Sequence, residues 1–176
     1  MGVSGCGKSI VGFALAQRLG WRFLKGDSLH PAENKAAMAA GIAFNDAMRL
    51  PWLQAVAHGR HEDPAGCIAS CSALRRSYRD ILRWQGPVFF VQLELGLQQT
   101  RVRMQGRPDH FMNPALADSQ HANLEPLGHD EWGITVDAIN STEAPIDVVC
   151  DGLQSHIEGW KSAGPQGFER QHIHGT

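Results

Sequence analysis

The sequence predicts an α/β fold in which a parallel sheet is flanked by helices. Short apolar strands alternate with amphipathic helices along most of the chain, an order that requires crossovers between parallel strands. A glycine-rich stretch near the start, Gly2-x-x-x-x-Gly7-Lys8-Ser9, leads into the first helix. Ligands of such sheets bind beyond the carboxyl ends of the strands. We therefore expect the functional residues at that edge.

The composition favours a small-molecule partner. The chain has 176 residues, enough for one domain with a sizeable core. Its net charge of -2 offers no broad basic surface, so neither nucleic acid nor an anionic membrane is an expected partner. No apolar run approaches the ~18 residues of a membrane span, and no signal-peptide pattern is present. A cytoplasmic location is expected.

The elements follow from hydrophobic periodicity and from turn residues. Apolar residues at helical spacing predict a first helix from Lys8 to Leu19, ended by Gly20. Further helices are predicted at residues 31–40, 51–58, 74–84, 97–105, 114–123 and 145–160. Strands are predicted at residues 21–24, 67–71, 88–93 and 134–137. We expect one domain over residues 1–160 and a flexible tail over residues 161–176.

The glycine-rich stretch has the spacing of a phosphate-binding loop. Glycines let the backbone curl closely enough to present several amide donors to a triphosphate. Lys8 would reach the outer phosphates, and Ser9 would ligate Mg²⁺. The residues expected to bind ATP here are Gly2, Val3, Ser4, Gly5, Cys6, Gly7, Lys8 and Ser9. The alternative is a glycine-rich turn that binds nothing.

The strand that should precede this loop is not in the sequence. Such a loop normally follows a buried strand, and Met1 leaves no residues to form one. We expect either that the natural chain starts upstream of Met1 or that the sheet lacks its central strand and is destabilised. The first explanation is the preferred one.

Several stretches resemble the gluconate kinases (gluconokinases), which are small P-loop kinases of sugar acids. The stretches are MGVSGCGKS, GDSLHPAEN, the segment ending in RLPWL, CSALRRSYRDILR and HFMNPALADSQHANLEPL. The resemblance implies a P-loop kinase fold whose first strand is missing here, with substrate-side helices at about residues 28–60 and a lid at about residues 103–123. It also implies transfer of the ATP γ-phosphate to the 6-hydroxyl of D-gluconate, with Mg²⁺. A homodimer is a family-based expectation.

The resemblance suggests which residues perform the phosphoryl transfer. Asp27, at the carboxyl end of a predicted strand, matches the second acid of a family Asp-x-Asp pattern and would be the base or an orienting carboxylate. Its alternative role is a helix cap. Lys8 and Arg107 are the other predicted catalytic residues, and Arg103 and Arg107 are expected to contact ATP at the start of the lid. Both arginines could instead be ordinary surface charges.

Four residues are expected to bind the sugar acid: Asp27, His30, Arg49 and Arg79. Arg49 and Arg79 match family positions in the substrate pocket, where a guanidinium can hold a carboxylate with two parallel hydrogen bonds. Either could be a solvated charge on a helix. His30 would bond substrate hydroxyls, or it could be structural.

Two departures from the family pattern bear on catalysis. Lys25 stands where the family has an acid that helps hold Mg²⁺, and it could pair with Asp27. Met48 replaces an acid just before Arg49. These changes permit a degenerate relative that binds nucleotide or sugar acid without catalysis. A kinase of another small hydroxy acid, such as shikimate, is the third hypothesis.

Overall fold

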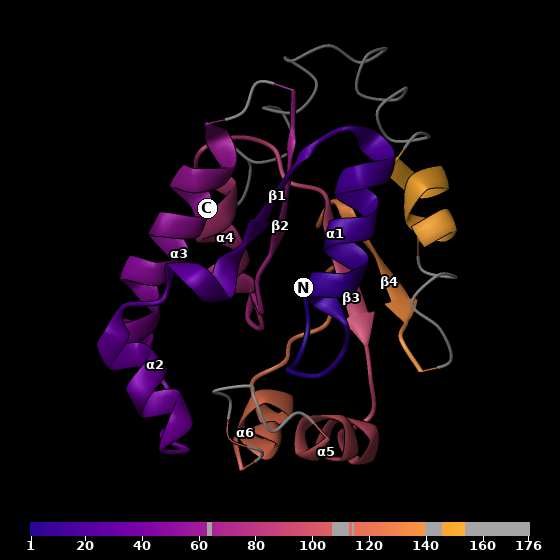
Figure 1. Ribbon diagram of the computed structural model, residues 1–176. Helices are drawn as coiled ribbons and strands as arrows, with labels where there is room; N and C mark the ends of the chain where they lie inside the picture. The colour runs from indigo at the N-terminus through magenta and orange to yellow at the C-terminus, as the bar shows by residue number, and fades with distance from the viewer. Residues whose placement is uncertain (63–64, 107–112, 114, 140–145, 154–176) are drawn as a thin grey trace.

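The computed structural model describes residues 1–62, 65–106, 113, 115–139 and 146–153 (Figure 1). Its helices are α1 (Lys8–Leu19), α2 (Ala32–Ala39), α3 (Asp46–His61), α4 (Arg76–Arg83), α5 (Leu97–Gln105) and α6 (Leu116–Ala122). Its strands are β1 (Arg22–Lys25), β2 (Cys67–Ser70), β3 (Phe90–Glu94) and β4 (Gly133–Asp137). A 3-10 turn, η1 (Gly26–Leu29), follows β1, and residues 146–153 are helical. The alternating order expected from the sequence is confirmed.

The strands form two parallel pairs. β1 lies beside β2 with Arg22 opposite Cys67, and β3 lies beside β4 with Phe90 opposite Gly133. The two pairs are separate sheets within the part of the chain that the structure describes. Figure 1 shows them on either side of the segment that starts at the N-terminus.

Met1 and Gly2 connect the two pairs through their backbone. The Met1 amino group donates to the Val91 carbonyl, and the Leu93 amide donates to the Met1 carbonyl at 3.0 Å. On the other side, the Gly2 amide donates to the Ser72 carbonyl, also at 3.0 Å. Burial lowers the pKa of the Met1 amino group to about 6. The phosphate loop therefore starts between β3 and the segment after β2.

Helix α3 begins earlier than the sequence prediction. The prediction placed its start at Pro51, but the helix begins at Asp46 because the side chain of Asn45 accepts a hydrogen bond from the Met48 amide at 2.9 Å. Pro51 then lies inside the helix and leaves one backbone carbonyl without its helical donor. The cap therefore outweighs the proline in setting the start of α3.

Two apolar clusters support the loop and the cleft described below. One surrounds α1, β3 and β4 and includes the loop residues Val3 and Cys6, both almost completely buried. The other lies between α3 and α4 and includes Trp52 and Leu53. No helix among the described residues has both the length and the apolar character to cross a bilayer.

Candidate active site

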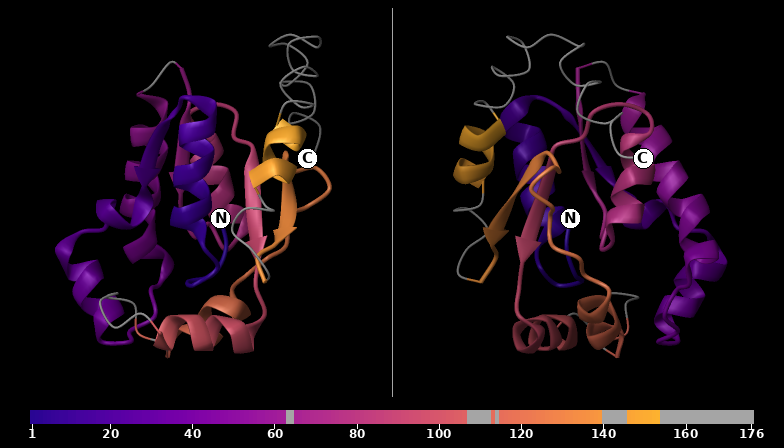
Figure 2. Two further views of the ribbon diagram at one scale, coloured as in Figure 1. Left: turned by 45° about the vertical axis from the view of Figure 1, so that its right-hand side comes forward. Right: turned by 180° about the vertical axis from the view of Figure 1, so that it is seen from behind.

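An open cleft lies where the phosphate loop, the α2–α3 side and α6 meet. Its lining residues are Lys8, Asp27, His30, Met38, Ile42, Ala43, Phe44, Arg49, Trp52, Ser72, Leu116, Ser119 and Gln120. Figure 2 shows the α5–α6 pair lying across the same end of the molecule to which the phosphate loop bends. The sequence elements expected to form the two substrate sites thus meet at one end of the strands.

The phosphate loop is shaped to receive an anion at the start of α1. Gly5 and Gly7 have φ angles of 80° and 96°, a region that glycine adopts without strain. No described residue accepts a hydrogen bond from the backbone amides of Gly7, Lys8 or Ser9. These amides lie at the positive end of the helix, so their arrangement fits a phosphate group.

The Ser4–Gly5 corner of the loop is already bonded to protein. The Ser4 amide donates to Gln120 Oε1 at 2.7 Å, and Gln120 Nε2 donates to Ser4 Oγ at 3.0 Å. Arg103 donates to the carbonyls of Ala138 and Ile139 at 2.9 Å and approaches that of Gly5 at 3.5 Å. Arg103 therefore holds the loop to the end of β4 rather than lining the cleft. The sequence analysis did not single out Gln120.

Asp27 is fixed in the cleft by its neighbours. The Gly26 carbonyl accepts a hydrogen bond from Trp52 Nε1 at 2.8 Å, and a Cβ at Gly26 would come within 2.3 Å of the Ser70 carbonyl. Only glycine permits this approach of η1 to β2. Lys25 is exposed, does not line the cleft and makes no ion pair with Asp27 in the described structure. The Lys25–Asp27 pair that the sequence permits is therefore not formed in the described structure.

His30 is buried in the wall of the cleft. Its ring stacks on Trp52 with centroids 4.1 Å apart and meets Phe44 edge-on at 5.5 Å. Burial lowers the pKa of His30 to about 4, so the imidazole is neutral at pH 7. Its Nδ1 has no hydrogen-bond partner among the described residues. A neutral imidazole that lines the cleft is suited to a substrate hydroxyl.

Arg49 brings a guanidinium to the cleft without a carboxylate partner. It donates to the Phe44 carbonyl at 3.3 Å and lies 5.4 Å from the Tyr78 ring centre, while its Nε has no partner in the described structure. Asp46 is instead bonded to the Tyr78 hydroxyl at 2.5 Å and paired with Arg75 at 3.6 Å. Burial lowers the pKa of Arg49 below its usual range. Such a cation favours an anionic ligand.

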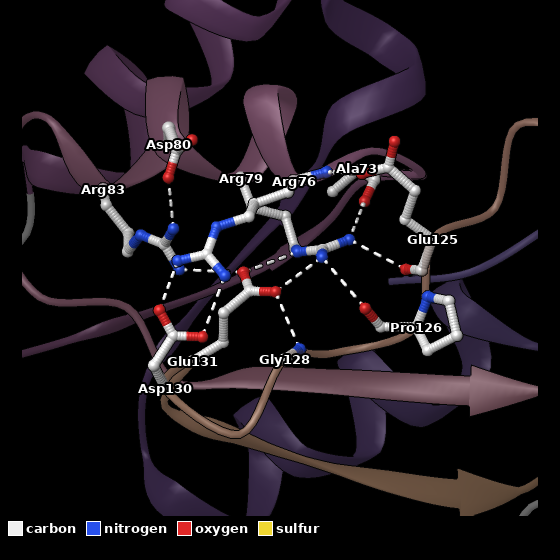
Figure 3. Close-up of polar contacts among 10 residues, drawn as sticks. All are labelled: Ala73, Arg76, Arg79, Asp80, Arg83, Glu125, Pro126, Gly128, Asp130 and Glu131. Carbon is white, nitrogen blue, oxygen red and sulfur yellow. Dashed lines mark hydrogen bonds and ion pairs between the residues drawn. The ribbon is translucent and has the colours of Figure 1, made fainter. Parts of the chain in front are cut away.

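Arg79 lies outside the cleft, so the structure does not bring it together with the other residues that were predicted to bind substrate. It is 0% exposed and does not line the cleft. Its guanidinium pairs with Glu131 at 2.5 Å and donates to the carbonyls of Glu125 and Pro126 (Figure 3). Burial alone would raise the pKa of Glu131, but hydrogen bonds from Arg79, Gly128 and Arg83 lower it to about 2. Arg79 therefore holds α4 to the segment before β4.

The remaining predicted residues have mixed outcomes. Met48 does not line the cleft, and its carbonyl accepts a hydrogen bond from Asn34 at 3.0 Å. Arg107 and the predicted tail lie outside the described residues. The described residues include no group of three or more His, Cys, Asp or Glu that could hold a metal. A metal here would rely on one or two protein oxygens and on phosphate oxygens, which is the usual arrangement for Mg²⁺.

Comparisons with known proteins agree with this geometry. A family model described as "Shikimate kinase" matches residues 4–128. A gluconokinase from Gluconobacter oxydans is 44% identical over 163 residues, which cover 90% of this chain and 89% of the relative. The thermosensitive gluconokinase of Escherichia coli is 40% identical over 155 residues, covering 85% and 82%.

Solved structures extend the agreement to the fold. The crystal structure of a gluconokinase from Sinorhizobium meliloti superimposes with a TM-score of 0.82 at 38% identity and covers 90% of this chain and 91% of that one. An APS kinase from Mycobacterium tuberculosis, at 19% identity and a TM-score of 0.58, shares the fold. The fold class expected from the sequence is confirmed.

Proposed function

This chain belongs to the gluconokinase family of small P-loop kinases, and we propose that it transfers the γ-phosphate of ATP to the 6-hydroxyl of D-gluconate. The products are ADP and 6-phospho-D-gluconate. The observation that carries the choice of acceptor is Arg49, a partly buried cation that has no carboxylate partner among the described residues and lies in the cleft that Lys8 and Asp27 also line. A sugar acid offers the carboxylate that this cation favours.

The residues at the start of α1 bind the phosphates of ATP. The amides of Gly7, Lys8 and Ser9 donate to phosphate oxygens, and the Lys8 ammonium balances their charge. Ser9 would supply a hydroxyl ligand to Mg²⁺, together with phosphate oxygens. When bound, Mg²⁺ neutralises charge that develops on the transferring phosphoryl group.

The acceptor side lies across the cleft. Arg49 binds the carboxylate, and His30 bonds a hydroxyl, since both side chains line the cleft. Asp27 accepts the proton of the attacking hydroxyl, whose oxygen forms the new bond to phosphorus as the bond to ADP breaks. Trp52 holds both residues in place. Its ring stacks on His30, and its Nε1 donates a hydrogen bond to the carbonyl of Gly26, next to Asp27.

Two other functions are separable by experiment. The family model described as "Shikimate kinase" favours a test of shikimate as acceptor. The degenerate, non-catalytic relative was suggested by Lys25, but the exposed position of Lys25 outside the cleft supports retained catalysis. The division into one domain with a lid, the cytoplasmic location and the homodimer remain predictions.

The test is ADP release with MgATP and one acceptor at a time: D-gluconate, shikimate or D-glucose. We expect release with D-gluconate, and a loss of kcat of about 100-fold or more in Asp27→Asn, since a positioned base contributes that much. Glu33→Gln, an exposed residue of α2, is the matched control and should keep wild-type kcat. Bound MgATP without ADP release from any sugar acid would refute the proposal, and release with shikimate alone would replace the substrate.

A further inference from the structure

One peptide group of the phosphate loop is held at both of its ends. The carbonyl of Val3 accepts a hydrogen bond from Lys8 Nζ at 2.8 Å. The amide of Ser4, which belongs to the same peptide group, donates to Gln120 Oε1 at 2.7 Å. Because the carbonyl and the N–H of a peptide group are coplanar and point in opposite directions, whatever fixes the N–H also fixes the carbonyl. Gln120 and Lys8 are thus connected through one rigid unit.

Gln120 is itself firmly placed. Its Nε2 makes a second contact, with Ser4 Oγ at 3.0 Å. The helix that carries it, α6, is attached to α5 by a hydrogen bond between Thr100 Oγ1 and His121 Nε2 at 3.0 Å and by the Arg101–Asp118 ion pair at 2.5 Å. A side chain with two contacts on an anchored helix can set the orientation of the peptide group that it meets.

We propose that Gln120 is a positioning residue, which orients the Val3–Ser4 peptide group and thereby sets where the Lys8 ammonium lies when phosphate enters the loop. The hydrogen bond to Gln120 also polarises the peptide group and strengthens the bond that its carbonyl accepts from Lys8. The free amides of Gly7–Ser9 remain available for phosphate, so the two halves of the loop have different roles. This inference rests on the proposed function, in which Lys8 binds the phosphates of ATP.

The first test is the Kd of MgATP by calorimetry for wild-type protein and Gln120→Leu. Leucine removes both hydrogen bonds to Ser4 with little change in side-chain volume. We expect Kd to rise about five- to tenfold, which corresponds to the net loss of about one good hydrogen bond. Gln98→Leu, at an exposed position of α5, is the control and should bind as wild type. Ser4→Ala keeps the amide contact and should change Kd less than about twofold. If Gln120→Leu lowers the Tm, the binding test is made with Gln120→Met instead, because methionine keeps the unbranched side chain of glutamine.

The second test separates positioning of Lys8 from a structural role. If Gln120 acts through Lys8, adding Gln120→Leu to Lys8→Met should raise Kd no further, because the group that it positions is gone. The same fold-change in both backgrounds would overturn the inference, as would a wild-type Kd in Gln120→Leu. Wild-type protein that does not bind MgATP would instead overturn the proposed function, and this inference with it.

Discussion

Arg49 and Arg79, which the sequence places in one pocket, should respond in opposite ways to the same substitution. Arg49 lies in the cleft, and within the described part of the chain its Nε has no partner and its guanidinium has no carboxylate pair. Arg79 is completely buried and bonded to Glu131. We predict that Arg49→Met loses substrate binding but keeps stability, and that Arg79→Met loses stability.

The magnitudes follow from these contacts. Removing a charge-assisted, two-point contact to the substrate carboxylate costs about 2–3 kcal/mol, which is about 30- to 150-fold in the KM for D-gluconate. Removing Arg79 takes two donors from the buried Glu131, which keeps only Arg83 and the Gly128 amide, and also removes the donor to the Glu125 and Pro126 carbonyls. Breaking a buried ion pair in this way costs about 3–5 kcal/mol of folding free energy. For a chain of this length the Tm should fall by about 6–20 °C. Arg49→Met breaks no ion pair, so its Tm should stay within about 2 °C of wild type or rise.

The assay measures the Tm of both variants by calorimetry and the KM of each for D-gluconate and for ATP. The KM for ATP should be unchanged in Arg49→Met, because Arg49 lies on the acceptor side. A Tm loss in Arg49→Met equal to that in Arg79→Met, or an unchanged KM for D-gluconate, would refute the reasoning. Arg49→Lys, which keeps the charge but not the fork of donors, should recover only part of the affinity.

Three further outcomes are expected. Gly133→Ala should lower the Tm by several degrees in a melting scan, because its Cβ would lie 2.2 Å from the Phe90 carbonyl, whereas Gly152→Ala, with no atom nearer than 3.5 Å, should not. Stability should fall as pH drops from about 6.5 towards 4, since the unfolded chain protonates His30 while the native state, with its pKa of about 4, does not. In denaturation curves recorded across this pH range, His30→Gln should weaken the pH dependence of the unfolding free energy by the equivalent of up to about one bound proton. An unchanged pH dependence would contradict this prediction. Lys25→Asp should change kcat less than about threefold in the ADP assay, because Lys25 is exposed and outside the cleft.

The features predicted correctly from the sequence are local ones. The phosphate loop, α1 and the Gly20 cap depend on residues within a few positions of one another, so spacing alone predicts them. Asp27 was placed correctly in the cleft because a strand end and a loop both lie at the carboxyl edge of the strands.

The features that the sequence could not settle depend on distant partners. Arg49 and Arg79 look alike in sequence, and only the position of Glu131, 52 residues beyond Arg79, separates them. The contact of Gln120 with Ser4 joins residues 116 positions apart and has no local signal. The start of α3 was predicted at Pro51, whereas the helix begins at Asp46, where the Asn45 side chain caps it.

The measurement that tests the central claim most directly is phosphorus NMR of the products formed from MgATP and an equimolar mixture of D-gluconate and shikimate. We predict one phosphate ester, on the 6-hydroxyl of gluconate, formed in step with ADP and absent with Asp27→Asn. A phosphate ester of shikimate, or ATP that stays intact while bound to the protein, would contradict the account.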